Sequence, residues 1–260
     1  MQPRLRLGWL IVILALSFQA KAEERLGIVL IHGKNGRPEQ LTPFAQKLAG
    51  QGYLTEQPEM CWSRGRIYDR PYLDCLDEIG AAVDRLNARH ATAIVLLGMS
   101  LGGNGALGYG ARHSNLKGII TLVPGHAPEF ISRRPEIAAD ISRARLLAAS
   151  GRGDVKTVFS DVNVRTASYG FVVETTPNIY LSFFVPDSAA VLPDNAARLS
   201  APLLYVAAEG DPSQRGRGYI FDRVPKHPLN KYVTVVADHV GVPAVSHEIA
   251  LNWLKELVQP

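Results

Sequence analysis

The sequence predicts an α/β domain built on a mostly parallel sheet. Three observations lead to this prediction: short apolar runs recur along the chain, helical patterns alternate with them, and the runs are too continuous for half-exposed strands. Strands that alternate with helices form α/β folds, in which helices flank the central sheet. With 260 residues, of which 47% are hydrophobic, the chain can bury one sizeable core. We therefore expect one main domain.

The first 22 residues have the layout of a secretory signal peptide. Arg4 and Arg6 precede an apolar stretch from Trp9 to Phe18, and the small residues Ala20 and Ala22 follow it. The alternative is an uncleaved membrane anchor, but the apolar stretch is shorter than the ~20 residues that span a bilayer. We expect cleavage after Ala22, no membrane span in the mature domain of residues 23–260, and a periplasmic or secreted product.

Loss of residues 1–22 also changes the electrostatic interpretation. The segment holds three basic residues and no acidic one, so the formal net charge falls from +4 to +1. A domain so close to neutral gives no reason to expect a nucleic-acid partner, despite the basic isoelectric point of the full chain.

The chain contains two cysteines, Cys61 and Cys75. In an oxidising compartment such a pair is expected to form a disulfide, here one that closes a short loop. Two buried free thiols are the alternative. Thiols rarely stay reduced outside the cytosol, so the disulfide is the favoured prediction.

Five apolar runs are expected to form buried strands: Leu26 to Ile31, Ala93 to Leu97, Gly118 to Leu122, Leu203 to Ala207 and Tyr232 to Val236. A helical pattern of apolar residues follows Pro71, at Leu76, Ile79, Val83 and Leu86. A second apolar helix face closes the chain, at Ile249, Leu251, Leu254 and Leu257.

Residues 125–200 interrupt this alternation and are interpreted as a cap inserted in the domain. They separate two predicted strands and contain one predicted helix, Pro135 to Ser150. Aromatic residues are frequent after this helix: Tyr169, Phe171, Tyr180, Phe183 and Phe184. An ordinary long connection is the alternative, but connections of more than about 15 residues usually have a function or a structure of their own.

Ser100 occupies a turn that favours chemistry over packing. It lies in Gly98-Met99-Ser100-Leu101-Gly102, directly after a predicted strand and before a run of small residues. This is the G-x-S-x-G nucleophile elbow, in which glycines two residues on either side of the serine avoid a collision across a strained turn. The turn exposes the hydroxyl and brings it close to backbone N–H groups at a helix N-terminus.

On this motif, and on His32-Gly33-Lys34 after the first strand, the chain resembles the α/β-hydrolase family from about Leu26 to the C-terminus, the cap excepted. The resemblance implies an oxyanion hole formed by the backbone N–H after the nucleophile, that of Leu101, and by one from the early loop, that of Lys34. It implies a structural role for His32, as a support of that loop.

The family order of serine, acid and histidine assigns the other two members of a catalytic triad. Asp211 follows the fourth predicted strand and His239 follows the fifth. Glu209 is the alternative acid, since it lies in the same turn. His247 is the alternative histidine, although its place on the closing helix favours a structural role.

Other chemistries find less support in the sequence. No histidine pair has metal-ligand spacing, and the glycines near Lys34 lack the full phosphate-loop pattern, so we expect neither a metal nor a cofactor. Serine at the elbow argues against haloalkane dehalogenase chemistry, which uses aspartate there in this family. His126, just past the third predicted strand, is a tentative substrate-binding residue, with a plain turn role as the alternative.

These observations predict an exported serine hydrolase that acts on a small-molecule acyl substrate. A carboxylesterase is the simplest form, with lipase, thioesterase and peptidase as variants. The alternative is a non-catalytic binding or scaffold protein with the same fold, because a fold by itself does not establish an activity.

Overall fold

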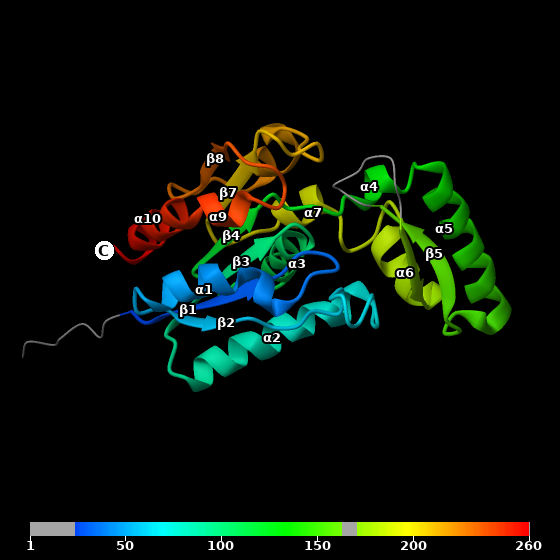
Figure 1. The fold of residues 1–260 in the computed structure, drawn as a ribbon, viewed down its shortest axis with the longest axis horizontal. Coiled ribbons are helices and arrows are strands. Elements are labelled where there is room, and N and C mark those ends of the chain that lie inside the picture. The colour runs from blue at the N-terminus through cyan, green and yellow to red at the C-terminus, as the bar shows by residue number, and fades with distance from the viewer. Residues whose placement is uncertain (1–23, 163–170, 260) are drawn as a thin grey trace, which may run out of the picture.

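The computed structural model describes residues 24–162 and 171–259 (Figure 1). The predicted signal peptide therefore lies outside the described residues. In the described part, six parallel strands form the central sheet in the order β2-β1-β3-β4-β7-β8. Their bounds are β1 Leu26–Ile31, β2 Leu54–Glu56, β3 Ala93–Met99, β4 Gly118–Leu122, β7 Leu203–Ala208 and β8 Lys231–Val235. The predicted parallel α/β sheet is thus confirmed.

The apolar runs form strands because both of their faces are covered. Every side chain of β1, β4 and β7 is buried. Neighbouring side chains point to opposite faces, so that Ile28 and Leu30 join one core while Val29 and Ile31 join the other. The sequence did not predict β2, a three-residue strand that pairs with β1 at the edge of the sheet.

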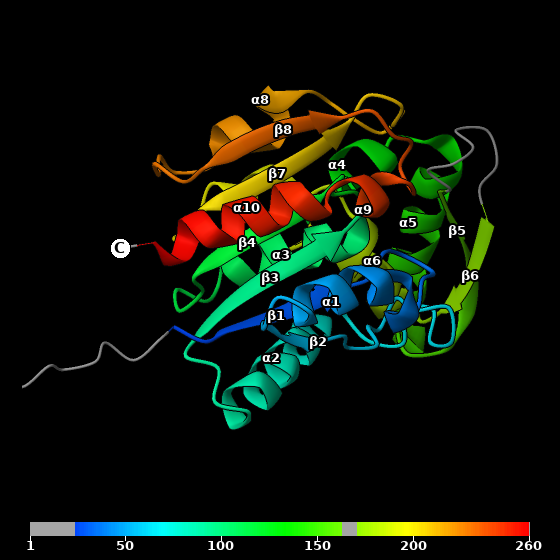
Figure 2. The same ribbon diagram turned by 60° about the vertical axis from the view of Figure 1, so that its left-hand side comes forward.

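Helices cover both faces of the sheet, as Figure 2 shows. On one face lie α1 (Thr42–Ala49) and α10 (His247–Val258), and on the other lie α2 (Tyr72–Ala88) and α3 (Leu101–Gly110). The two predicted apolar helix faces lie on α2 and α10, and both pack against the sheet. The described part also contains these short elements: η1 (Pro38–Leu41), α8 (Arg217–Ile220), η3 (Phe221–Arg223) and α9 (Val242–Val245).

Most of the segment between β4 and β7 lies beyond the carboxyl ends of the sheet strands, whereas its last helix packs beside α3 (Figure 1). Its elements are α4 (Pro128–Ile131), α5 (Pro135–Leu147), the π-helical turn η2 (Ala148–Arg152), β5 (Thr157–Asp161), β6 (Phe171–Thr175), α6 (Pro177–Phe184) and α7 (Leu192–Ala196). The predicted helix of the cap corresponds to α5 and the start of η2. The antiparallel pair β5–β6 and the helices α4, α6 and α7 were not predicted.

Aromatic side chains of the cap form a small core of their own. Tyr180 stacks on Phe159 and Phe184 with ring centroids 4.4 and 4.3 Å apart. Phe183 packs edge-on against Tyr68, which precedes α2, at 4.7 Å. Among the aromatic residues singled out in the sequence, Tyr169 lies outside the described residues. The cap aromatics therefore hold the cap together and join it to the domain below.

Cys61 and Cys75 form the predicted disulfide, which joins the segment before α2 to the first turn of that helix. In residues 24–162 and 171–259, no helix is long and apolar enough to cross a membrane.

Candidate active site

Ser100 sits at a sharp turn between β3 and α3. Its φ of 54° lies in the left-handed region, which is strained for a residue with a side chain. A Cβ atom on Gly102 would lie 2.1 Å from the carbonyl oxygen of Ile31, and one on Gly98 would lie 2.1 Å from that of Gly102. The backbone can therefore pass through this turn only with glycine on both sides of the serine.

Three side chains from three separate loops meet at this turn. The Nε2 atom of His239 lies 2.9 Å from the hydroxyl oxygen of Ser100, and its Nδ1 atom lies 2.7 Å from Oδ2 of Asp211. All three residues are buried, with exposed fractions of 5–7%. The structure thus brings together the serine, acid and histidine in the order that the sequence analysis expected.

The Asp211 carboxylate is held by hydrogen bonds on both oxygens. Oδ1 accepts from the backbone N–H and the hydroxyl of Ser213 at 2.9 and 2.7 Å, and Oδ2 accepts from Gln214 at 3.2 Å as well as from His239. Burial by itself would raise the pKa of Asp211, but the hydrogen bonds from His239 and Ser213 outweigh it and lower the pKa to about 2. The carboxylate is therefore ionised at neutral pH.

The two alternative residues lie elsewhere. Glu209 precedes Asp211 by two residues, and it is exposed. His247 lies at the start of α10, where its ring packs on Phe44 with centroids 4.3 Å apart and its Nδ1 atom lies 3.0 Å from the carbonyl oxygen of Ala244. The geometry therefore places Asp211 and His239, and not these alternatives, beside Ser100.

The two backbone N–H groups expected to form an oxyanion hole belong to residues that line one cavity with Ser100. Lys34 occupies the second position of a β-turn closed by a 3.1 Å hydrogen bond from Gly36 to Gly33, so that its own N–H takes no part in the closing bond. Leu101 begins α3, and the first N–H groups of a helix have no acceptor within it. Both amides are thus suited to bind a developing negative charge.

His32 supports the Lys34 turn from below. The ring is fully buried and accepts a 3.1 Å hydrogen bond from the backbone N–H of Met60, while the carbonyl of His32 accepts from the Trp62 indole at 3.0 Å. The amide of Asn35 in turn donates to the carbonyl of Trp62 at 2.9 Å. Since Cys61 lies between these partners, the disulfide anchors the segment on which the turn rests.

The side chain of Lys34 contacts the cap, and the sequence did not predict this contact. Its Nζ atom lies 2.7 Å from Oδ1 of Asp161 at the end of β5 and donates to the carbonyl of Val162 at the same distance. Asp161 is fully buried and also accepts a 3.0 Å hydrogen bond from the hydroxyl of Tyr68. The turn that carries one proposed oxyanion donor is therefore tied directly to the cap.

Other supporting residues were missed as well. Ser213 and Gln214 hold Asp211, and Gln40 accepts a 3.0 Å hydrogen bond from the backbone N–H of Gly33. Ser213 could have been found, because an aspartate often accepts a hydrogen bond from the backbone N–H two residues further along in such a turn. Gln40 carries no comparable local signal.

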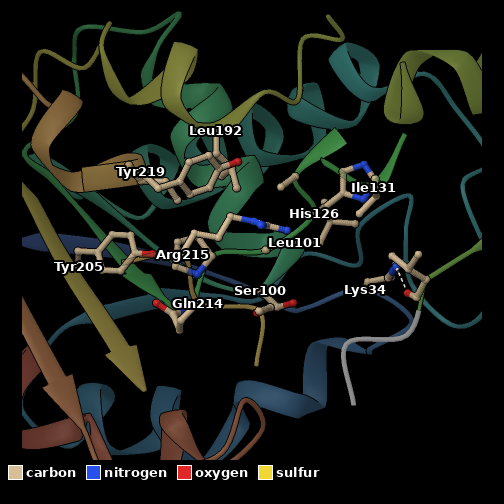
Figure 3. Close-up of a pocket in the computed structure, with 16 residues that line it drawn as sticks. Lys34, Ser100, Leu101, His126, Ile131, Leu192, Tyr205, Gln214, Arg215 and Tyr219 are labelled. Carbon is tan, nitrogen blue, oxygen red and sulfur yellow. Dashed lines mark hydrogen bonds between the residues drawn. The ribbon is translucent and has the colours of Figure 1, made fainter. Parts of the chain in front are cut away.

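Two cavities border Ser100 on different sides. One of about 80 Å³ is lined by Leu101, Leu192 and Tyr219 among others, and Figure 3 shows its labelled residues. The other, of about 460 Å³, is more open and is lined by His239 and Phe171. A substrate bound at Ser100 can therefore extend in two directions.

His126 lines the smaller cavity, but its ring nitrogens are occupied or closed off. Nε2 donates to the carbonyl of Phe183 on α6 at 2.8 Å, and Nδ1 is shielded from solvent without a hydrogen bond in the described part of the chain. Burial, helped by the charge of Lys34, lowers the pKa of His126 to about 4. The ring is neutral at working pH, so it offers a substrate no charge, and a substrate-binding role stays a prediction.

Across the described ranges, no group of three or more His, Cys, Asp or Glu side chains has an arrangement that could hold a metal ion.

No protein-family model matches the sequence, and a search of curated proteins finds no match either. Solved structures do match. A monoacylglycerol lipase from Paleococcus ferrophilus is 17% identical, with a TM-score of 0.64 over 89% of this chain and 94% of that one. A carboxyl esterase from Bacillus coagulans is 13% identical, with a TM-score of 0.65 over 92% of each chain.

A third similar structure is an extracellular alpha/beta-hydrolase from a Paenibacillus species. It is 15% identical, with a TM-score of 0.52 over 89% of this chain and 98% of that one. At such low sequence identities, structural similarity indicates a shared fold and does not by itself indicate a shared activity. Together with the order of the parallel strands, it assigns this chain to the α/β-hydrolase fold, as its motifs predict.

Proposed function

We propose that the protein is an exported serine hydrolase that cleaves a carboxylic ester through an acyl-serine intermediate. The observation that carries the proposal is the hydrogen-bonded chain from the hydroxyl of Ser100 through the ring of His239 to the carboxylate of Asp211. A strained turn that holds three buried polar side chains in line is costly, and packing alone does not require it.

In the first half of the proposed reaction, His239 Nε2 removes the hydroxyl proton as Ser100 Oγ attacks the carbonyl carbon of the ester. The carbonyl oxygen gains a negative charge, which the amides of Lys34 and Leu101 stabilise, by about 3 kcal/mol per donor in well-studied enzymes. His239 then gives its proton to the leaving alcohol as the carbon–oxygen bond breaks. The acyl group remains on Ser100.

In the second half, His239 activates a water molecule that attacks the acyl-serine. The bond to Ser100 breaks, the hydroxyl regains its proton, and the free carboxylic acid leaves. Asp211 stays ionised throughout, because its pKa lies at about 2. It keeps Nδ1 protonated and stabilises the charged ring in both halves.

Two of the similar structures carry names consistent with this activity, one a monoacylglycerol lipase and the other a carboxyl esterase. Their identities to this chain are low, so they support the reaction class without indicating a substrate.

Export is proposed from residues 1–22 and is supported by the disulfide between Cys61 and Cys75, a bond that persists in oxidising compartments. N-terminal sequencing of protein recovered from the periplasm or the medium should find a start near Glu23. An intact Met1 on a membrane-bound form would contradict export.

The nucleophile is tested with a fluorophosphonate probe and a panel of nitrophenyl esters. The wild type should take the label and hydrolyse short esters, whereas Ser100→Ala should lose the label and fall in activity by a factor on the order of 10³ to 10⁶. Ser142→Ala is the matched control, because this serine lies exposed on α5. A folded wild type that neither takes the probe nor cleaves any ester would favour the binding-protein alternative.

A further inference from the structure

The two cavities at Ser100 can be assigned to the two halves of an ester. In the proposed mechanism the leaving alcohol receives its proton from His239, so it must depart on the side of that ring. His239 lines the larger cavity and is not among the residues of the smaller one. The smaller cavity, which also contains Leu101, is therefore the acyl pocket.

We infer that Arg215 makes this acyl pocket selective for acyl groups that end in a carboxylate, such as the half-esters of short dicarboxylic acids. The inference rests on the proposed function, since it names the substrate class of the same site. The loop that carries Asp211 carries Arg215 four residues later, and the guanidinium reaches into the acyl pocket, as Figure 3 shows.

The charges around the acyl pocket favour an anion. Its lining in the described part of the chain includes two cations, Lys34 and Arg215, and no aspartate or glutamate. The charge of Lys34 is neutralised by its 2.7 Å ion pair with Asp161. Within residues 24–162 and 171–259, no carboxylate lies within 4.0 Å of the Arg215 guanidinium, so its positive charge is available to a ligand.

Arg215 is nevertheless held in place. Its guanidinium centre lies 3.7 Å from the ring centroid of Phe130 and 5.9 Å from that of Tyr219. Such contacts orient a guanidinium without cancelling its charge. Glu129, on the same short helix as Phe130, is hydrogen-bonded to the hydroxyl of Tyr219, beyond ion-pair distance from Arg215. A carboxylate that enters the pocket would meet a fixed donor with a planar, two-pronged geometry that suits it.

The rest of the pocket suits a short carbon chain. Leu101, Ala127, Ile131 and Leu192 line it, and its volume is about 80 Å³, far below that of the leaving-group side. A few methylene groups can therefore lie between the carbonyl at Ser100 and the charge at Arg215. A long neutral acyl chain would place apolar atoms against an unpaired guanidinium, which is unfavourable because the charge loses solvent.

The test compares two esters that differ mainly in charge, mono-(4-nitrophenyl) glutarate and 4-nitrophenyl pentanoate, which share a five-carbon acyl chain. For the wild type we expect kcat/KM to be at least about tenfold higher for the glutarate, with a preference that weakens as salt is added. In Arg215→Met the ratio should fall at least about tenfold, and Arg215→Lys should keep part of it, since lysine retains the charge without the planar fork.

Arg217→Met is the matched control. Arg217 lies two residues further on and is exposed like Arg215, but it pairs with Asp222 and does not line the pocket, so its loss should leave the ratio unchanged. An active Arg215→Met with the wild-type ratio would overturn the inference, as would a wild type that prefers the pentanoate.

A binding measurement separates this inference from the proposed function. Glutarate monoamide and pentanamide, in which an uncleaved amide replaces the ester and only the first carries a carboxylate, are titrated calorimetrically into the wild type and Arg215→Met. Tighter binding of the glutarate monoamide that depends on Arg215 supports the anion site even in a protein that cleaves neither ester, whereas absence of that dependence overturns it. Absence of turnover by the wild type on every ester counts against the proposed function alone.

Discussion

The central sheet and the cap contribute to the candidate site in different ways. The sheet side supplies Ser100, Asp211 and His239 from loops at its carboxyl end, and the backbone there is sterically restricted, as the 2.1 Å approach at Gly102 illustrates. The cap reaches the site through a few side chains, chiefly Asp161, which pairs with Lys34, and His126, which lines the smaller cavity. The three candidate catalytic side chains therefore come from the sheet side, while the cap contacts the turn beside them.

The largest effect should come from the histidine on the sheet side. His239→Ala removes the base that touches Ser100, and kcat should fall by a factor on the order of 10⁴ or more. His247→Ala removes a buried ring that packs on Phe44, so it should lower the melting temperature and leave most of the kcat. Steady-state kinetics on a short nitrophenyl ester measure both. The reverse pattern would move the catalytic histidine to α10.

A methyl group at Gly102 tests the restriction of the backbone. It would collide with the carbonyl of Ile31, so Gly102→Ala should destabilise the protein by about 4 kcal/mol or more, or prevent folding. Gly151 of the cap is the comparison, because it has a positive φ, of 77°, which Gly102 does not have, and open space around its Cβ position. Gly151→Ala should cost only about 1 kcal/mol, from the left-handed backbone alone. Urea unfolding measures both changes. Equal losses of unfolding free energy in the two variants would show that the backbone at Gly102 is no more restricted than the backbone at Gly151.

The disulfide between Cys61 and Cys75 lies outside the sheet, and its removal tests whether this bond supports the Lys34 turn. Replacing Cys61 and Cys75 by serine should lower the free energy of unfolding by about 3 kcal/mol, as expected for a loop of this length. Because the bond anchors the segment that holds the Lys34 turn, kcat should fall as well. Unfolding and kinetics of the oxidised and reduced wild type provide the check. Unchanged kcat after full reduction would show that the turn does not depend on the bond.

The difference between the central sheet and the cap also explains which features could be predicted from the sequence. Strands such as β1 are buried on both faces, so they appear as continuous apolar runs, whereas β2 is a three-residue edge strand that contains Thr55 and Glu56. In the cap, β5 and β6 each bury one face, with Val158 half exposed beside a buried Phe159. Alternation over so few residues gives a weak signal, and the packing of these strands is set by contacts with α5 and α6.

Residues of the site follow the same rule. Ser100, Asp211 and His239 could be named because each lies within four residues of the end of a strand and in a short local pattern. Lys34 and Asp161 are 127 residues apart, and neither position carries a local signal for the pair. Arg215 was equally hidden, because the composition of a segment does not show which of its charges faces a pocket.

The smallest predicted effect concerns the link between the two regions. Asp161→Asn keeps an oxygen that can accept a hydrogen bond from Lys34 but removes the charge that holds its ammonium group. If the cap positions the oxyanion turn through this pair, kcat for a small neutral ester should fall about tenfold, or ~1.4 kcal/mol, while KM changes little. Asp140→Asn is the matched control, because Asp140 also bonds the cap strand β5, through the amide of Ser160, but does not touch Lys34. The Lys34→Met variant and the double variant complete a cycle, in which a coupling energy near zero would show that the cap and the turn act independently.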